Sequence, residues 1–141
     1  MSLYELIYTI KNIALKQPNV RFFGEGNIYS LLNATPSVEY DAVILTQGQH
    51  TQDSQFNYFD FNIFFVSRLV DDLESNRLQA QSIGIEVITN IVQYLIDVYD
   101  LETNGNITFN TFSEKFADEC AGCYGKITFV VEKELYCGEE Y

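Results

Sequence analysis

Basic residues are scarce in this sequence, and their scarcity limits the partners that the protein can bind. Of 141 residues, 20 are acidic and eight are basic, which gives a formal net charge of −12. The eight Lys and Arg residues are scattered singly, without a basic stripe. Nucleic-acid binding depends on clustered Lys and Arg that release counterions from phosphates. An ordinary sequence-specific DNA- or RNA-binding protein is therefore not expected.

Long hydrophobic runs and a complete set of cysteine pairs are also missing. No run of 18 apolar residues occurs, so we expect no membrane-spanning helix. The first residues, Met1–Glu5, lack the positively charged start of a signal peptide, and three Cys favour reduced thiols, which together predict an intracellular product. The length and a hydrophobic share of 47% predict a single domain over residues 1–141, with a flexible tail at 137–141.

The strongest local signal is an amphipathic helix at the start of the chain. Apolar residues recur at helical spacing from Leu3 to Ala14, which predicts a helix over about residues 3–17. Ser2 and Glu5 have the spacing of a capping box, in which each side chain satisfies a free backbone N–H group. Pro18 ends the helix, because the residue before a proline avoids helical geometry.

Shorter signals follow up to residue 67. They predict a short strand at Val20–Phe23, a turn at residues 24–27, a strand or one helical turn at 28–32, a strand at 42–46, an exposed loop or projecting hairpin tip at 47–55, and a strong strand at 56–67. The last of these strands alternates apolar and polar residues and then becomes apolar on both faces. That change is typical of a strand in the middle of a sheet.

The second half of the sequence predicts a long helix and two more strands. The helix covers about residues 76–100, and its apolar stripe comprises Leu78, Ile85, Ile88, Ile91, Val92, Leu95, Ile96 and Tyr99. A strand at 106–112, a polar segment at 113–125 and a last strand at 126–135 follow. The predicted fold is a two-layer α+β domain, in which a short N-terminal helix and a long central helix pack on a mostly antiparallel sheet.

Three cysteines and the single histidine form the one candidate zinc site. Cys120 and Cys123 have the spacing of a zinc knuckle, and Cys137 with His50 would complete a tetrahedral set. One such pair is weak evidence for a metal, and the favoured interpretation is that these are plain buried or loop thiols. We therefore predict no metal site and no bound cofactor.

A second oxygen-rich segment has some features of a calcium loop. Asp100, Glu102, Asn104 and Gly105 fall at positions one, three, five and six of an EF-hand pattern. Position twelve is Thr111, where a bidentate Glu is required. An Asn-Gly turn after a helix explains the same residues without a metal.

Catalytic patterns are missing as well. The one histidine lies in a glutamine-rich loop with no nucleophile motif, and Gly24–Gly26 lacks the third glycine of a dinucleotide site. The adjacent acidic pairs point apart, unlike the two carboxylates of an acid–base site; they are Asp71/Asp72, Asp118/Glu119 and Glu139/Glu140. The sequence predicts no enzyme and no catalytic residue.

Aromatic residues are abundant, and several lie outside the predicted core stripes. The chain has ten Tyr and eleven Phe, and those outside the stripes include Tyr4, Tyr8, Tyr40, Phe56, Tyr58 and Tyr94. Such residues often anchor protein–protein contacts, and covering the edge of a small core explains any single one of them equally well. As a group they favour a subunit of an assembly.

Four segments of the sequence resemble a known family. They are Asn27–Tyr29, Ala42–His50, Arg68–Ile85 and Lys115–Gly122. Together they resemble small virion proteins encoded in the neck and tail gene clusters of crAss-like tailed phages that infect gut Bacteroides. The predicted order of elements is also similar to that of the tail-terminator fold, which assembles into rings.

The resemblance implies a structural subunit of the virion, made in the host cytoplasm, that forms a sixfold or twelvefold ring. Its partners would be other copies of itself and the portal, neck and tail proteins, and no membrane is involved. Genomic DNA would pass through the central channel without specific binding. The candidate contact between subunits is the polar loop with a nearby tyrosine: Gln49, His50, Thr51, Gln52, Asp53, Ser54, Gln55 and Tyr58.

The net charge fits this interpretation independently, because an acidic channel wall does not retain a DNA duplex. Two alternatives stay open. An acidic protein can imitate DNA and inhibit a host nuclease, although most carboxylates here fall at turns, helix starts and the tail. The other alternative is a small thiol or zinc regulator built on Cys120, Cys123 and Cys137.

Overall fold

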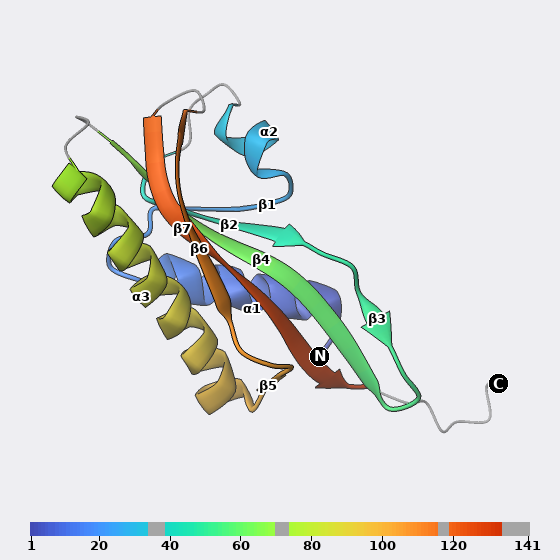
Figure 1. Ribbon diagram of the computed structural model, residues 1–141. Coiled ribbons are helices and arrows are strands. Elements are labelled where there is room, and N and C mark those ends of the chain that lie inside the picture. Colours follow the sequence, from blue (N-terminus) through green and yellow to red (C-terminus); the bar gives the residue numbers. More distant parts are fainter. Residues whose placement is uncertain (34–38, 70–73, 116–118, 134–141) are drawn as a thin grey trace.

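The structure, a computed structural model, describes residues 1–33, 39–69, 74–115 and 119–133. The helices are α1 (Leu3–Lys16), α2 (Ile28–Leu32) and α3 (Glu74–Tyr99). The strands are β1 (Phe22–Glu25), β2 (Ala42–Gln47), β3 (Thr51–Gln52), β4 (Phe56–Arg68), β5 (Glu102–Thr103), β6 (Thr108–Lys115) and β7 (Glu119–Glu132). They form one sheet with the order β1-β2-β4-β7-β5, in which β3 pairs with β4 and β6 with β7 (Figure 1).

The predicted α+β class is confirmed. Among the described strands, every pairing is antiparallel except that of β1 with β2. Helices α1 and α3 contribute to one core cluster with the sheet, so they cover the same face, while α2 packs in a smaller cluster on the other face. The predicted ends of the two long helices are also correct to within a few residues. Residues 56–67 lie in the middle of the sheet as predicted, since β4 lies between β2 and β7.

Helix α1 forms as its sequence predicts. The Glu5 backbone N–H donates to Ser2 Oγ at 3.1 Å, and the Ser2 N–H donates to Glu5 Oε1 at 3.3 Å, which completes the capping box. Its buried stripe is Leu6, Ile10, Ile13 and Ala14. The helix ends at Lys16, because Gln17 is already extended before Pro18.

The long antiparallel pair of β4 and β7 is the centre of the sheet. Its register runs without a break from Phe56 opposite Glu132 to Arg68 opposite Cys120. Since side chains alternate along a strand, Phe61, Phe65 and their odd-numbered neighbours face α1 and α3. Phe64 and Val66 face the other way and pack in the cluster that includes α2.

The predicted polar segment at 113–125 is wrong. In the structure β6 continues to Lys115, β7 begins at Glu119, and Cys120 to Cys123 are buried. The polar composition hid the small residues of this segment, which are needed for close packing. A Cβ atom at Gly122 would lie 1.8 Å from the carbonyl oxygen of Phe65, so only glycine fits opposite β4 at this position.

The predicted turn at 24–27 is also corrected. Gly24 and Glu25 belong to β1, and Gly24 is buried where a Cβ atom would lie 3.1 Å from Leu31 Cδ1 of α2. The turn is confined to the residues that follow, with Gly26 at a φ of 137°. Residues 28–32 form a helical turn rather than a strand, because Asn27 caps them by accepting a hydrogen bond from the Ser30 N–H.

Helix α3 was predicted nearly to its ends, but its buried stripe differs. Ile88, Ile91, Val92 and Leu95 are buried as predicted, whereas Leu78 and Tyr99 are 51% and 44% exposed. Ala80 and Val87 are buried in addition. Gly84 lies at the closest approach of helix and sheet, where a Cβ atom would be 2.7 Å from Cys123 Sγ and 2.9 Å from Phe65 Cδ1.

This close approach gives a test of the packing. Alanine is a better helix former than glycine by about 1 kcal/mol, so Gly84→Ala would stabilise an exposed helix. Here we expect it to lower the free energy of unfolding by roughly 1–3 kcal/mol, because the methyl group would push α3 off the sheet. Urea unfolding measures the change, and Ser82→Ala on the exposed side of α3 is the control. A Gly84→Ala variant that is as stable as the native protein would contradict this packing.

Candidate functional site

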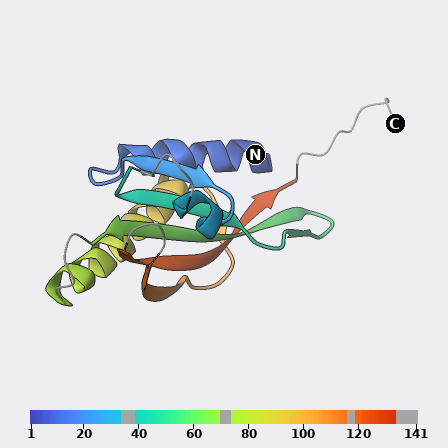
Figure 2. The same ribbon diagram turned by 90° about the horizontal axis from the view of Figure 1, so that it is seen from above.

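The polar loop that the sequence singled out is a projecting hairpin, which is one of the two predicted forms. We call residues 47–58 the arm. Within it, Thr51 and Gln52 of β3 pair with Tyr58 and Asn57 of β4. Figures 1 and 2 show that the arm extends past the ends of both long helices. Its outer residues, 51 to 55, are all exposed, so the arm presents its polar groups to solvent.

Asp53 organises the tip of the arm. Its Oδ1 accepts hydrogen bonds from the N–H groups of Gln55 at 2.8 Å and Phe56 at 2.7 Å, and its Oδ2 accepts one from the Tyr58 hydroxyl at 2.7 Å. The Tyr58 hydrogen bond and then the two backbone bonds lower the pKa of Asp53. The same contact with Asp53 raises the pKa of Tyr58. Asp53 is therefore ionised at neutral pH.

His50 fixes the base of the arm. Its Nδ1 accepts a hydrogen bond from the Asp60 N–H at 3.1 Å, which leaves the proton on Nε2 to donate to Gln47 Oε1 at 2.9 Å. The ring lies edge-on to Phe59 and Phe61, with centroid distances of 5.5 Å. Both ring nitrogens are thus used within the chain, and the residue positions the arm.

The arm base is also tied to the edge of the sheet. Gln47 Nε2 donates to Glu25 Oε2 at 3.3 Å, and the Gly48 N–H donates to the Asp60 carbonyl at 2.7 Å. Asp60 Oδ1 in turn accepts a hydrogen bond from the Thr128 hydroxyl. This network connects β1, β2, β4 and β7, so the direction of the arm is set by the whole sheet.

The structure does not bring the candidate zinc ligands together. Cys120 and Cys123 are three residues apart in one strand, so they point to opposite faces of the sheet and belong to different core clusters. They cannot bind the same ion. Cys137 lies outside the described residues, and within the described part of the chain no three His, Cys, Asp or Glu residues gather as a metal site.

Burial also determines the chemistry of the two thiols. Desolvation raises the pKa of Cys123 to about 12, which keeps its thiol protonated and unreactive at neutral pH. Cys120 is buried on the other face, where its Sγ lies 3.5 Å from the Tyr40 hydroxyl. Both thiols are therefore buried side chains that fill space in the core.

The segment that resembles a calcium loop is a turn between β5 and β6. The Asn104 N–H donates to the Thr128 carbonyl at 2.9 Å, and Gly105 has a φ of 87°, which an Asn-Gly turn requires. Glu102 belongs to β5. Of the acidic pairs, Asp71/Asp72, Asp118 and Glu139/Glu140 lie outside the described residues, as does the predicted tail at 137–141.

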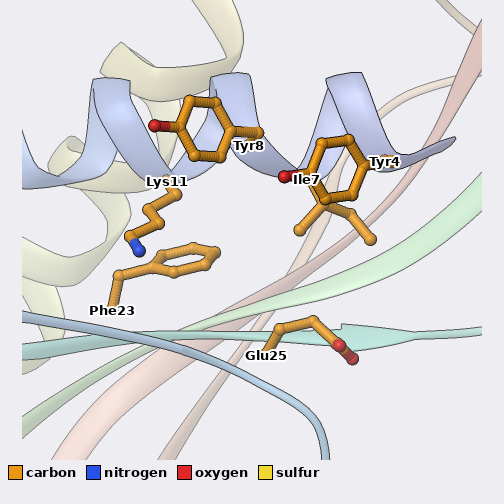
Figure 3. A pocket seen from close by; sticks show the side chains of 6 residues that line it. All are labelled: Tyr4, Ile7, Tyr8, Lys11, Phe23 and Glu25. Carbon is orange, nitrogen blue, oxygen red and sulfur yellow. The ribbon is translucent and has the colours of Figure 1, made fainter. Parts of the chain in front are cut away.

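A second surface feature combines α1 with the edge strand. A groove of about 320 Å³ is lined by Tyr4, Ile7, Tyr8 and Lys11 of α1 and by Phe23 and Glu25 of β1 (Figure 3). Tyr4 and Tyr8 are 76% and 52% exposed and stack on each other, with ring centroids 6.2 Å apart. We call this feature the α1–β1 groove.

Of the residues that line this groove, only the tyrosines were singled out by the sequence. Tyr4, Tyr8 and Tyr94 are exposed, as expected for aromatics outside the core stripes, but Tyr40, Phe56 and Tyr58 are half-buried. The partners on β1 were missed, because Phe23 and Glu25 were divided between a strand and a turn. Successive residues of a strand face opposite sides, so Phe23 faces α1 and Gly24 faces away from it. This alternation was the signal in the sequence that could have identified the β1 side of the groove.

Comparisons with known proteins do not add a family: the sequence matches no protein-family model and no curated protein. Among the helices of the described segments, none is both long and apolar enough to cross a membrane.

The role of Asp53 predicts a pH-dependent arm. Because its pKa is lowered in the folded protein, its stabilising effect is complete above the ordinary Asp value of about 3.9 and is lost as the pH falls through the lowered value. We expect the Gln55 and Phe56 amide signals in NMR spectra to titrate together below pH 3.9. Asp53→Asn should abolish this titration, and a midpoint at or above the ordinary value would contradict the assigned turn.

The burial of the thiols predicts their reactivity. In a Cys137→Ser variant at neutral pH, a thiol reagent such as dithionitrobenzoate should label neither Cys120 nor Cys123 in the native state and both in urea. The reason is burial, together with the raised pKa of Cys123. Rapid labelling of the native variant would support a thiol regulator instead.

Proposed function

We propose that this protein is a structural subunit of a phage virion that forms a ring in the neck or tail, as a tail terminator or as a head–tail joining ring. The resemblance of four sequence segments to neck and tail proteins of crAss-like phages suggested this role. The α+β fold agrees with the expected type of domain. The proposal otherwise depends on the arm and on the charge of the molecule.

The arm is the observation that carries the proposal. A two-stranded hairpin is only marginally stable alone, yet this one is held in a defined direction by His50, by the Asp53 turn and by the Lys133 N–H, which donates to the Gln55 carbonyl at 2.9 Å. Its exposed face carries polar side chains and no charge except Asp53. A well-positioned projection with free polar groups suits contact with a second subunit.

A ring requires two different contact surfaces on each subunit. A heterologous contact places one patch against a different patch of the neighbour, and the assembly closes when the rotation between subunits allows it. The arm supplies one such patch. The exposed tyrosines Tyr4, Tyr8 and Tyr94 lie elsewhere on the molecule, on α1 and α3, and aromatic residues of this kind are enriched in interfaces.

The charge supports passage of DNA through the ring. With a net charge of −12, the protein repels phosphate groups, so a duplex inside an acidic channel would remain mobile. The described carboxylates are spread over several elements, for example Glu5 on α1, Glu86 and Asp97 on α3, and Glu119 and Glu132 at the two ends of β7. An inhibitor that imitates DNA would need its carboxylates in one array, which this distribution does not favour.

Electron microscopy and native mass spectrometry of the purified protein test the proposal. We expect rings of six or twelve subunits with a central channel. Isolated chains or dimers at high concentration would contradict a ring and would favour the acidic inhibitor, and a mass increment from bound metal would favour the zinc regulator.

The arm itself is tested by deleting residues Thr51–Gln55. The deleted residues are all exposed and none belongs to a core cluster, so circular dichroism should still show the folded domain while rings are lost. The matched control is Asn104→Ser with Asn106→Ser, which changes the exposed turn between β5 and β6 and should leave the rings intact. Unchanged rings after the deletion would exclude the arm from the interface.

A further inference from the structure

Charge is distributed unevenly along this chain, and the imbalance restricts how two copies can meet. Residues 1–21 contain three basic side chains (Lys11, Lys16 and Arg21) and one acidic side chain (Glu5), a formal charge of +2. The other 120 residues contain five basic and 19 acidic side chains, a formal charge of −14. A contact that includes the region of α1 therefore reduces the repulsion between two copies.

The α1–β1 groove lies in this region and has the form of a binding site for an extended segment. Ile7 and Phe23 form an apolar floor, Tyr4 and Tyr8 form an aromatic wall, and Lys11 adds a positive charge (Figure 3). Lys11 forms no salt bridge with another residue of the described segments, and its side chain is exposed. The groove thus combines apolar contact area with one cation, Lys11, and one carboxylate, Glu25, which accepts a hydrogen bond from Gln47 of the same chain.

The groove also borders an open sheet edge. Strand β1 is the last strand on its side of the sheet among the described strands, and it pairs with β2 alone. Alternate N–H and C=O groups of such a strand point away from the sheet and can pair with another strand. Proteins bind extended segments in this way, by adding a strand to a free edge while side chains fill a neighbouring groove.

We propose that the α1–β1 groove is the socket for the arm of a second copy, so that each subunit inserts its arm into the next. This inference rests on the proposed ring. The net positive charge of residues 1–21 favours the arm as the occupant: residues 47–58 contain no Lys or Arg, and Asp53 is their one acidic residue. Asp53 Oδ1 already accepts two backbone N–H bonds, but Oδ2 accepts only the Tyr58 hydroxyl, so Oδ2 can still accept a bond from Lys11.

The backbone of the arm fits the same site. Thr51 and Gln52 of β3 are exposed, and β3 pairs with β4 alone among the described strands, so its outer edge is free to pair with β1 of the neighbour. Figures 1 and 2 show the tip directed away from α1 of its own chain. Arm and socket are therefore different patches that meet only between two copies, as a closing ring requires.

Charge reversal in the socket is the first test. Lys11→Glu should abolish the rings seen by native mass spectrometry. The control, Lys126→Glu on the other face of the sheet, changes the net charge by the same amount and should leave them intact. Equal loss of rings in both variants would show a general charge effect and would overturn the socket.

Cross-linking between two variants is the second test and locates the contact. In a Cys137→Ser background, Tyr8→Cys and Gln52→Cys proteins are mixed and gently oxidised. A disulfide-linked pair is expected only in the mixture, and replacing Tyr8→Cys by Thr89→Cys on α3 should abolish it.

The outcomes separate the two proposals. If the unmodified protein forms rings, but Lys11→Glu leaves them intact and no cross-link appears, the proposed socket is wrong and the proposed ring is retained. If the unmodified protein remains monomeric, both proposals fail.

Discussion

The close pairing of β4 with β7 is the constraint on which the rest of the structure depends. These two strands form the centre of the sheet, and their unbroken register fixes which side chains face α1 and α3. The pairing is possible because Gly122 leaves room for the backbone of Phe65, and α3 can lie on it because Gly84 leaves room for Cys123. The arm is an extension of β4, so its direction follows from the same register.

The arm shows how a polar segment can be ordered without a hydrophobic core of its own. Its base is held by the neutral imidazole of His50 between two phenylalanine edges, and its tip by the carboxylate of Asp53. Each of these groups satisfies backbone N–H groups that would otherwise need water. A projection held in this way keeps its direction before any partner is bound, which lowers the entropy cost of association.

The sequence predicted the fold class, both long helices and the central position of β4, because these features follow from hydrophobic periodicity and capping residues that act locally. It failed where tertiary packing decides the structure. Ala121, Gly122 and Gly125 have the composition of a loop, but close contact with β4 and β6 makes them part of a strand. The spacing of Cys120 and Cys123 matches a metal site only outside a strand, because residues three apart in a strand face opposite sides of the sheet.

The candidate surfaces were predictable to different degrees. The arm stood out as a polar stretch between two strands, although its internal hydrogen bonds depend on turn geometry that composition does not specify. The α1–β1 groove was not predictable, since it is formed by two segments whose relative position depends on the order of strands in the sheet. Exposed tyrosines on α1 indicated only that this side of the helix has no partner within the core.

The hydrogen bond from Gln47 to Glu25 joins the base of the arm to the rim of the groove in the same chain. A neighbouring subunit that occupies the groove therefore contacts Glu25, which helps to hold the arm of the same chain through Gln47. Its binding energy can stiffen that arm for the following subunit, so that two successive associations are thermodynamically linked. Growth of such a chain would be cooperative, with few partial arcs and an abundance of either free subunits or closed circles.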